Sequence, residues 1–146
     1  MPARQEQTSR GSRTYNAITA AYRAMLRKME EMLSEEGLTM PQFQALRIVA
    51  KGGVVCMREI SDEMFVTPAN VTGIIDRLES RGLLMRSGRK SDRRTTNIEL
   101  TPKGKALQEK VSGKYNEFMR GALRVLTQDE QTKLGELLVK LQKGMS

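Results

Sequence analysis

Apolar residues recur along this chain at steps of three and four, the spacing typical of one face of an α-helix. The first such stretch starts at Tyr15, and the pattern ends at Gly37. A second helix is predicted to begin between Thr39 and Pro41, because threonine caps helix starts and proline fits a first turn. Two consecutive glycines, starting at Gly52, end it. The N-terminal third is therefore predicted to be helical.

The middle of the chain contains the most distinctive pattern. A short apolar run with Cys56 leads into a short helix, and Thr67 then caps a further helix with Pro68 at its first position. Its inward stripe is apolar, whereas its outward face begins with small residues such as Asn70 and Gly73. A helix that enters the major groove must bring its first turns close to base edges. Two helices with a short connection and this leading face are typical of a helix-turn-helix.

A β-hairpin is predicted after Gly82, where apolar and polar residues alternate on two short strands. Its tip runs from Ser87 to Thr95. Between Arg86 and Lys105 there are seven basic and two acidic residues, seven minus two giving a net charge of +5. An isolated basic hairpin is usually only a solvated loop, but directly after a helix-turn-helix it favours contact with nucleic acid.

Two more helices are predicted at the C-terminus. One opens at Thr101-Pro102, and the last begins with a capping box between Thr127 and Glu130. Both have wide apolar stripes that need a partner. Because they lie outside the small core, we expect them to pair with a second copy across a two-fold axis.

These elements predict a mainly α protein with a small β-hairpin. A winged helix-turn-helix lobe is expected over about residues 39–101, with dimerisation helices over 14–37 and 102–144 on either side. Together they form a single domain over residues 14–146, preceded by a flexible basic arm over residues 1–13.

Composition narrows the class of partner. The chain has 146 residues, 38% of them apolar, which is enough to bury the core of one domain. Its 25 basic and 17 acidic residues give a net charge of +8 and favour an anionic partner, nucleic acid before a membrane surface. No apolar run is long enough to span a bilayer, and the N-terminus lacks the apolar middle of a secretory signal. We therefore expect a cytoplasmic protein.

The same composition argues against most catalytic chemistry. With one cysteine and no histidine, an intrachain disulfide is excluded and a zinc site is not expected. Common phosphate-binding and acyl-transfer motifs are absent, so we expect neither an enzyme nor a cofactor. Cys56 is expected to be half buried or more, and desolvation favours an inert structural thiol over a redox sensor.

Four motifs, in this order and spacing, resemble the MarR family of transcription regulators. They are Val71 to Glu79 (VTGIIDRLE), Gly82-Leu83, Asp92-Arg93-Arg94 and Leu100 to Gly104 (LTPKG). The resemblance covers about residues 15–141. It implies a homodimer whose terminal helices form the interface and whose two winged lobes bind successive major grooves of a pseudo-palindromic site on double-stranded DNA.

The resemblance also assigns roles to residues. Arg94 would enter the minor groove, where A·T-rich DNA concentrates negative potential, and Asp92 would support the hairpin. The remaining DNA contacts would come from the recognition helix and the wing: Thr67, Asn70, Thr72, Gly73, Arg77, Arg86, Arg89, Lys90 and Arg93. The function expected is that of a sequence-specific repressor.

Two questions stay open at this level. Many members of the family release DNA when a small phenolic or other anionic ligand binds, which would place Tyr22, Arg23 and Met29 near a pocket, although no motif identifies them. Alternatively, a winged helix can serve as a protein interaction module that binds an acidic partner without reading DNA sequence. A preference for particular duplexes would distinguish a sequence-specific DNA-binding regulator from such a protein interaction module.

Overall fold

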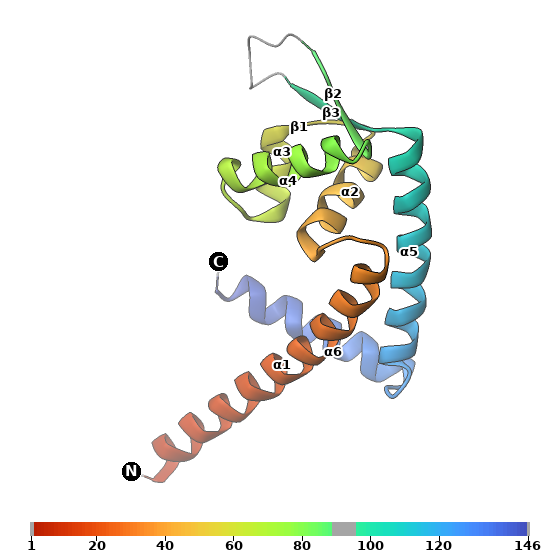
Figure 1. Cartoon of the computed structure of the whole chain (residues 1–146). Coiled ribbons are helices and arrows are strands. Elements are labelled where there is room, and N and C mark those ends of the chain that lie inside the picture. Colours follow the sequence, from red (N-terminus) through yellow and green to blue (C-terminus); the bar gives the residue numbers. More distant parts are fainter. Residues whose placement is uncertain (1, 89–95, 146) are drawn as a thin grey trace. The chain divides into compact units, whose positions relative to one another are not determined.

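The computed structural model of the protein describes residues 2–88 and 96–145. The chain divides into two compact units, Met1–Gly113 and Lys114–Ser146. The elements, in chain order, are α1 (Pro2–Glu35), α2 (Met40–Gly52), β1 (Val54–Cys56), α3 (Met57–Met64), α4 (Pro68–Ser80), β2 (Leu84–Ser87), β3 (Asn97–Leu100), α5 (Pro102–Leu123) and α6 (Gln128–Lys143) (Figure 1). The boundary between the units falls within α5.

The core of the first unit lies among α2, α3, α4 and the sheet. Its apolar side chains are fully buried: Phe43, Leu46 and Val49 from α2, Ile60 from α3, Val71, Ile75 and Leu78 from α4, and Ile98 from β3. Removing apolar area from water contributes about 25 cal/mol for each Å² buried, so these side chains supply most of the free energy that holds the lobe together. Helix α4 is thus held in place by the packing of its buried face, while its other face is exposed to solvent.

A three-stranded antiparallel sheet closes one side of the lobe, with strand order β1-β3-β2. Ile98 of β3 pairs with Val55 of β1 and with Arg86 of β2. The sequence predicted the β2–β3 hairpin but did not assign the short run at Val54–Cys56 to a strand. The predicted fold class, a mainly helical winged helix-turn-helix, is confirmed.

The helix starts follow the predicted caps. Thr39 and Gln42 form a reciprocal capping box at α2, and Thr67 caps α4 ahead of Pro68. Cys56 is half buried at the start of α3, as expected. Its backbone N–H donates to the Glu59 carboxylate at 2.6 Å, and this hydrogen bond lowers the pKa of Glu59.

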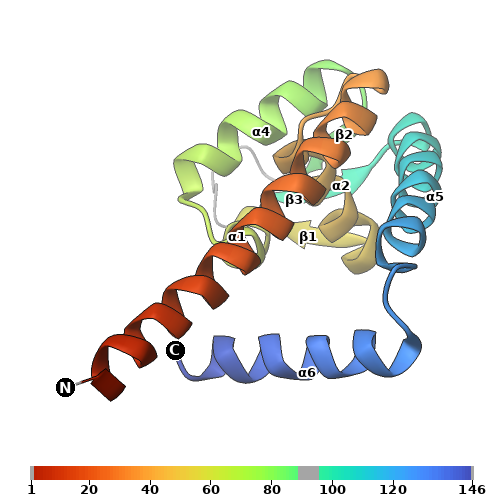
Figure 2. The ribbon, with the colours of Figure 1, turned by 90° about the horizontal axis from the view of Figure 1, so that it is seen from below.

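The first helix is much longer than the sequence pattern indicates. It starts at Pro2, whereas the predicted helix starts at residue 14 after a flexible arm (Figure 2). Proline is well suited to the first helical position, and a single interior glycine, Gly11, costs only about 1 kcal/mol. The apolar stripe that guided the prediction begins at Tyr15, so the polar turns before it gave no signal.

The second unit comprises the end of α5 and all of α6. Thr127 and Glu130 form the predicted capping box, with N–H to oxygen distances of 2.8 and 3.2 Å. The Gln131 side-chain amide donates to the carbonyls of Leu123 and Leu126, each at 3.0 Å, which fixes the turn between the two helices. No residue of α6 is buried in the single chain.

Within the described part of the chain, no helix combines the length and the apolar character required to cross a membrane.

Candidate nucleic-acid interface

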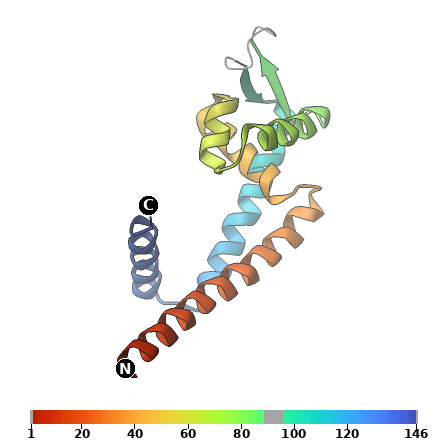
Figure 3. The ribbon, with the colours of Figure 1, turned by 90° about the vertical axis from the view of Figure 1, so that its left-hand side faces the viewer.

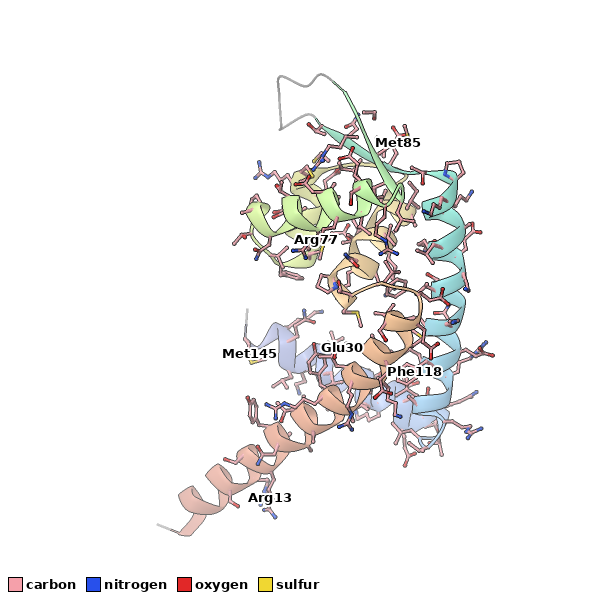
Figure 4. The ribbon with its side chains drawn as sticks, in the orientation of Figure 1. Arg13, Glu30, Arg77, Met85, Phe118 and Met145 are labelled. Carbon is pink, nitrogen blue, oxygen red and sulfur yellow. The ribbon has the colours of Figure 1, made fainter. Side chains whose placement is uncertain are left out.

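Helix α4 has one buried and one exposed face. Val71, Ile75 and Leu78 are completely buried, and they recur at the spacing of one helical stripe. The five residues predicted to contact DNA from this helix are all exposed: Thr67, Asn70, Thr72, Gly73 and Arg77. All five are therefore accessible to solvent, and Figure 4 shows Arg77 projecting from α4.

The first turn of α4 is built by side chains that satisfy the helix start. The Asn70 N–H donates to Thr67 Oγ1 at 3.4 Å, and Thr72 Oγ1 donates to the Pro68 carbonyl at 3.0 Å. Thr67 and Thr72 thus make local hydrogen bonds. The side-chain carboxamide of Asn70, on the same turn, has two N–H donors and one acceptor oxygen, and these can bind the edge of a base.

Gly73 leaves the middle of this surface flat. A Cβ placed on Gly73 would meet no atom within 4 Å, so nothing inside the chain requires a glycine there. Glycine in a helix interior costs roughly 0.5–1 kcal/mol relative to alanine. Close approach of another molecule to this surface would give a physical reason for a glycine at position 73.

The turn between α3 and α4 adopts a conformation that orients the second helix. Phe65 ends α3 with a φ of 54°, in the left-handed region that non-glycine residues seldom adopt. Ser61 is buried and its hydroxyl donates to the Val66 carbonyl at 2.7 Å. This hydrogen bond holds the chain as it enters α4.

Arg86 ties the hairpin to α4. Its Nη2 lies 2.6 Å from Asp76 Oδ1, and its Nη1 donates to the Glu79 carboxylate. Burial is the largest single influence on the pKa of Arg86 and lowers it, but hydrogen bonding to Asp76 and the two carboxylate charges outweigh burial and raise the pKa overall. Arg86 was predicted to contact DNA, whereas here its guanidinium bridges two carboxylates of α4.

The strands of the wing lead away from the lobe beside the C-terminal end of α4 (Figure 3). Ser87 Oγ donates to Glu99 Oε1 at 2.9 Å, which joins the last described residues of β2 to β3. The predicted wing residues Arg89, Lys90, Asp92, Arg93 and Arg94 lie outside the described residues.

The residues predicted near an effector pocket all lie on α1. Tyr22 is 63% exposed, Arg23 is exposed and Met29 is half buried on α1. A cavity of about 700 Å³ instead opens beside the outer side of α2, the end of α3 and Gln108 of α5, and none of the three lines it. Across residues 9–88 and 96–145, no group of three potential metal-ligating side chains comes together.

Comparisons with known proteins agree with this geometry. The MarR family model matches residues 38–96. The HTH-type transcriptional regulator YsmB of Bacillus subtilis is 30% identical over 118 residues, which cover 81% of each chain. The HTH-type transcriptional repressor MdtR of the same organism is 30% identical, over 86% of this chain and 81% of its own.

A solved structure extends the likeness to three dimensions. A cysteine-to-serine mutant of MarR from E. coli, complexed with operator DNA, is 26% identical with a TM-score of 0.77, and the match covers 86% of this chain and 91% of that one. An exposed second helix followed by a short antiparallel wing defines the winged helix-turn-helix class of DNA-binding regulators. The chain belongs to the MarR family of transcriptional regulators.

Proposed function

We propose that this chain is a homodimeric repressor that binds a pseudo-palindromic operator on double-stranded DNA. The recognition surface is the exposed face of α4, with Asn70 and Arg77 as the residues that read bases. Asparagine suits adenine, and arginine suits guanine or phosphate. The wing tip supplies phosphate and minor-groove contacts through Arg89, Lys90, Arg93 and Arg94, with Asp92 in support.

One observation carries this proposal: α4 has a fully buried face and a small, polar, exposed leading face on the same two turns. A rigid helix with Gly73 open to solvent can come close to base edges without displacing any part of the lobe. The net charge of +8 adds the attraction to phosphate that makes such binding tight and salt dependent.

The dimer is supported by the apolar stripe of α6. Leu134, Leu137, Leu138 and Leu141 recur at helical spacing and are 41–51% exposed in the single chain. A contiguous apolar face on a monomer is typical of an association surface. A two-fold operator requires two copies of α4 on one duplex, and a dimer supplies them.

The proposal includes a small anionic effector, supported by the cavity beside α2. Its lining carries Arg47 and Lys51 against one carboxylate, Glu63, together with the apolar Ile48 and Met64, and this excess of positive charge beside apolar surface suits an aromatic carboxylate. Benzoate and salicylate added to the protein–duplex complex should release the duplex. If the protein–duplex complex persists at millimolar concentrations of both compounds, the proposal of an aromatic carboxylate effector is wrong.

The function is tested by selection from a pool of random duplexes, followed by mobility shifts of the selected sequence under excess random competitor. We expect a consensus with two related half-sites and a preference of about 10³ or more over random DNA. Binding of all duplexes with equal affinity would instead favour the protein interaction module.

A further inference from the structure

The C-terminal end of α4 is connected to two distant segments through Arg81, the residue that caps the helix. Arg81 Nη1 donates to the Gly37 carbonyl at 2.6 Å, across 44 residues of sequence. The Arg81 carbonyl accepts a hydrogen bond from Lys103 Nζ at 3.0 Å. One residue therefore joins the turn after α1, the end of α4 and the start of α5.

Gly37 has a backbone that accommodates this contact. Its φ is +67°, and the Leu38 N–H donates back to the Leu33 carbonyl at 2.9 Å, so the turn ends α1 in the left-handed conformation that glycine adopts readily. A Cβ on Gly37 would lie 3.3 Å from Arg81 Nη2. The guanidinium thus occupies the space next to the glycine that a side chain would take.

Electrostatics favour the same arrangement. The carbonyl end of a helix carries partial negative charge, which a nearby cation stabilises. The last turn of α1 contains no basic residue, so Arg81 brings a positive charge to it from another helix. Lys103 brings a positive charge to the end of α4 in the same way.

The surroundings of Arg81 are tightly built. Thr101 Oγ1 donates to the Gly82 carbonyl at 2.6 Å, and a Cβ on the buried Gly104 would lie only 1.8 Å from the Leu83 carbonyl oxygen. On the other side, Lys110 Nζ lies 2.9 Å from Glu36 Oε2, joining α5 to the end of α1. The Arg81–Gly37 hydrogen bond is thus the contact that joins the end of α4 directly to the turn after α1, and a change in the direction of α4 relative to α1 would strain it.

We propose that Arg81 is a positioning residue that sets the direction of α4 relative to the C-terminal part of α1. The consequence for DNA rests on the proposed function: if α1 belongs to the dimer scaffold, the Arg81–Gly37 contact fixes the separation of the two recognition helices. Arg81 then determines which half-site spacing the dimer accepts, although it is not among the residues assigned to base or wing contacts.

The direction of α4 can be measured without DNA. Spin labels on Ala24→Cys in α1 and Ala69→Cys in α4, in a chain that also carries Cys56→Ser, report the distance between the two helices by pulsed electron resonance. Both labelled positions are exposed. Mixing with excess unlabelled chain restricts the signal to distances within one chain, whether or not the protein is a dimer.

We expect one narrow distance distribution in the parent and a distribution shifted or broadened by several ångströms in Arg81→Ala. If the alanine variant fails to fold, Arg81→Gln replaces it as the test. Glutamine is a milder change that removes the charge but keeps an amide donor, and it should also shift or broaden the distance distribution. Arg77→Ala is the matched control, because it removes an exposed arginine from the same helix, and its distribution should equal that of the parent.

A parent-like distribution in folded Arg81→Ala or Arg81→Gln overturns the proposal, because Arg81 would then contribute stability alone. The DNA consequence is read separately, by selecting duplexes with the parent and with Arg81→Gln and comparing half-site spacing. Relaxed spacing supports it, and unchanged spacing contradicts the role in DNA binding. A parent that selects no duplex refutes the proposed function, while the distance measurement still decides the role of Arg81.

Discussion

Arg86 of β2 lies 2.6 Å from Asp76 of α4, and the same guanidinium also bonds to Glu79 one turn further along the helix. Helix α4 and strand β2 are therefore linked by a cation between two carboxylates. The link also neutralises acidic groups on a helix whose surface is proposed to approach phosphate. Its loss should affect both the stability of the lobe and its binding to DNA.

Arg86→Ala is expected to lower the free energy of unfolding by about 1–2 kcal/mol, because it leaves two carboxylates without their cation in a partly buried site. Chemical denaturation measures this. Arg77→Ala, on the exposed face of the same helix, should leave stability within about 0.5 kcal/mol of the parent and weaken DNA binding. Equal stability of Arg86→Ala and the parent would show that the ion pairs of Arg86 with Asp76 and Glu79 do not stabilise the packing of β2 on α4.

Gly73→Ala should separate stability from function. The added methyl group meets nothing in the chain, and alanine favours a helix, so stability should rise by roughly 0.5–1 kcal/mol. Affinity for the selected duplex should fall by about tenfold or more, because the methyl group lies on the surface that approaches DNA. Gly11→Ala, also unobstructed but on α1, is the matched control and should leave DNA affinity unchanged. Undiminished affinity in Gly73→Ala would place the DNA surface elsewhere.

Arg94→Ala tests the wing, whose tip lies outside the described residues. Loss of one cation from the minor groove should weaken binding and reduce the slope of log affinity against log salt by about 1. Titrations at several salt concentrations measure both quantities. Parent-like affinity throughout would mean that the wing arginine does not touch DNA.

Leu137→Glu tests the association surface on α6. A carboxylate in the exposed apolar stripe should be costly to bury against a second copy, so sedimentation should show a dimer in the parent and a monomer in the variant at the same concentration. Thr132→Glu introduces the same charge at an exposed position on the other side of the helix and should remain dimeric. A dimeric Leu137→Glu protein, or a monomeric parent, contradicts this interface.

Local signals explain what could be predicted from the sequence. The caps at Thr39, Thr67 and Thr127, and the buried stripe of α4, follow from residues within one or two turns of each other. The starts of α2, α4 and α6 could therefore be predicted from the side chains that accept hydrogen bonds from free backbone N–H groups. The same locality gave the exposed face of α4, since opposite faces of one helix follow from its period.

The remaining features depend on residues that are far apart in the sequence or have no apolar pattern. Arg86 meets Asp76 only because the turn at Gly82 folds β2 back along α4, so charge alone suggested a DNA contact. The Arg81 contact with Gly37 spans 44 residues and had no signal at all. The turns of α1 before Tyr15 are polar, and the helix there could not be told from a mobile arm by hydrophobic periodicity.

The most direct test of the central claim, that the leading face of α4 reads bases, is to repeat the duplex selection with Asn70→Ala. We expect the selected consensus to relax at one position in each half-site, with about 1–3 kcal/mol of discrimination lost there and the salt slope unchanged. If Asn70→Ala selects the same sequence as the parent, with the same preference at every position, Asn70 does not read a base and the assignment of this face is contradicted.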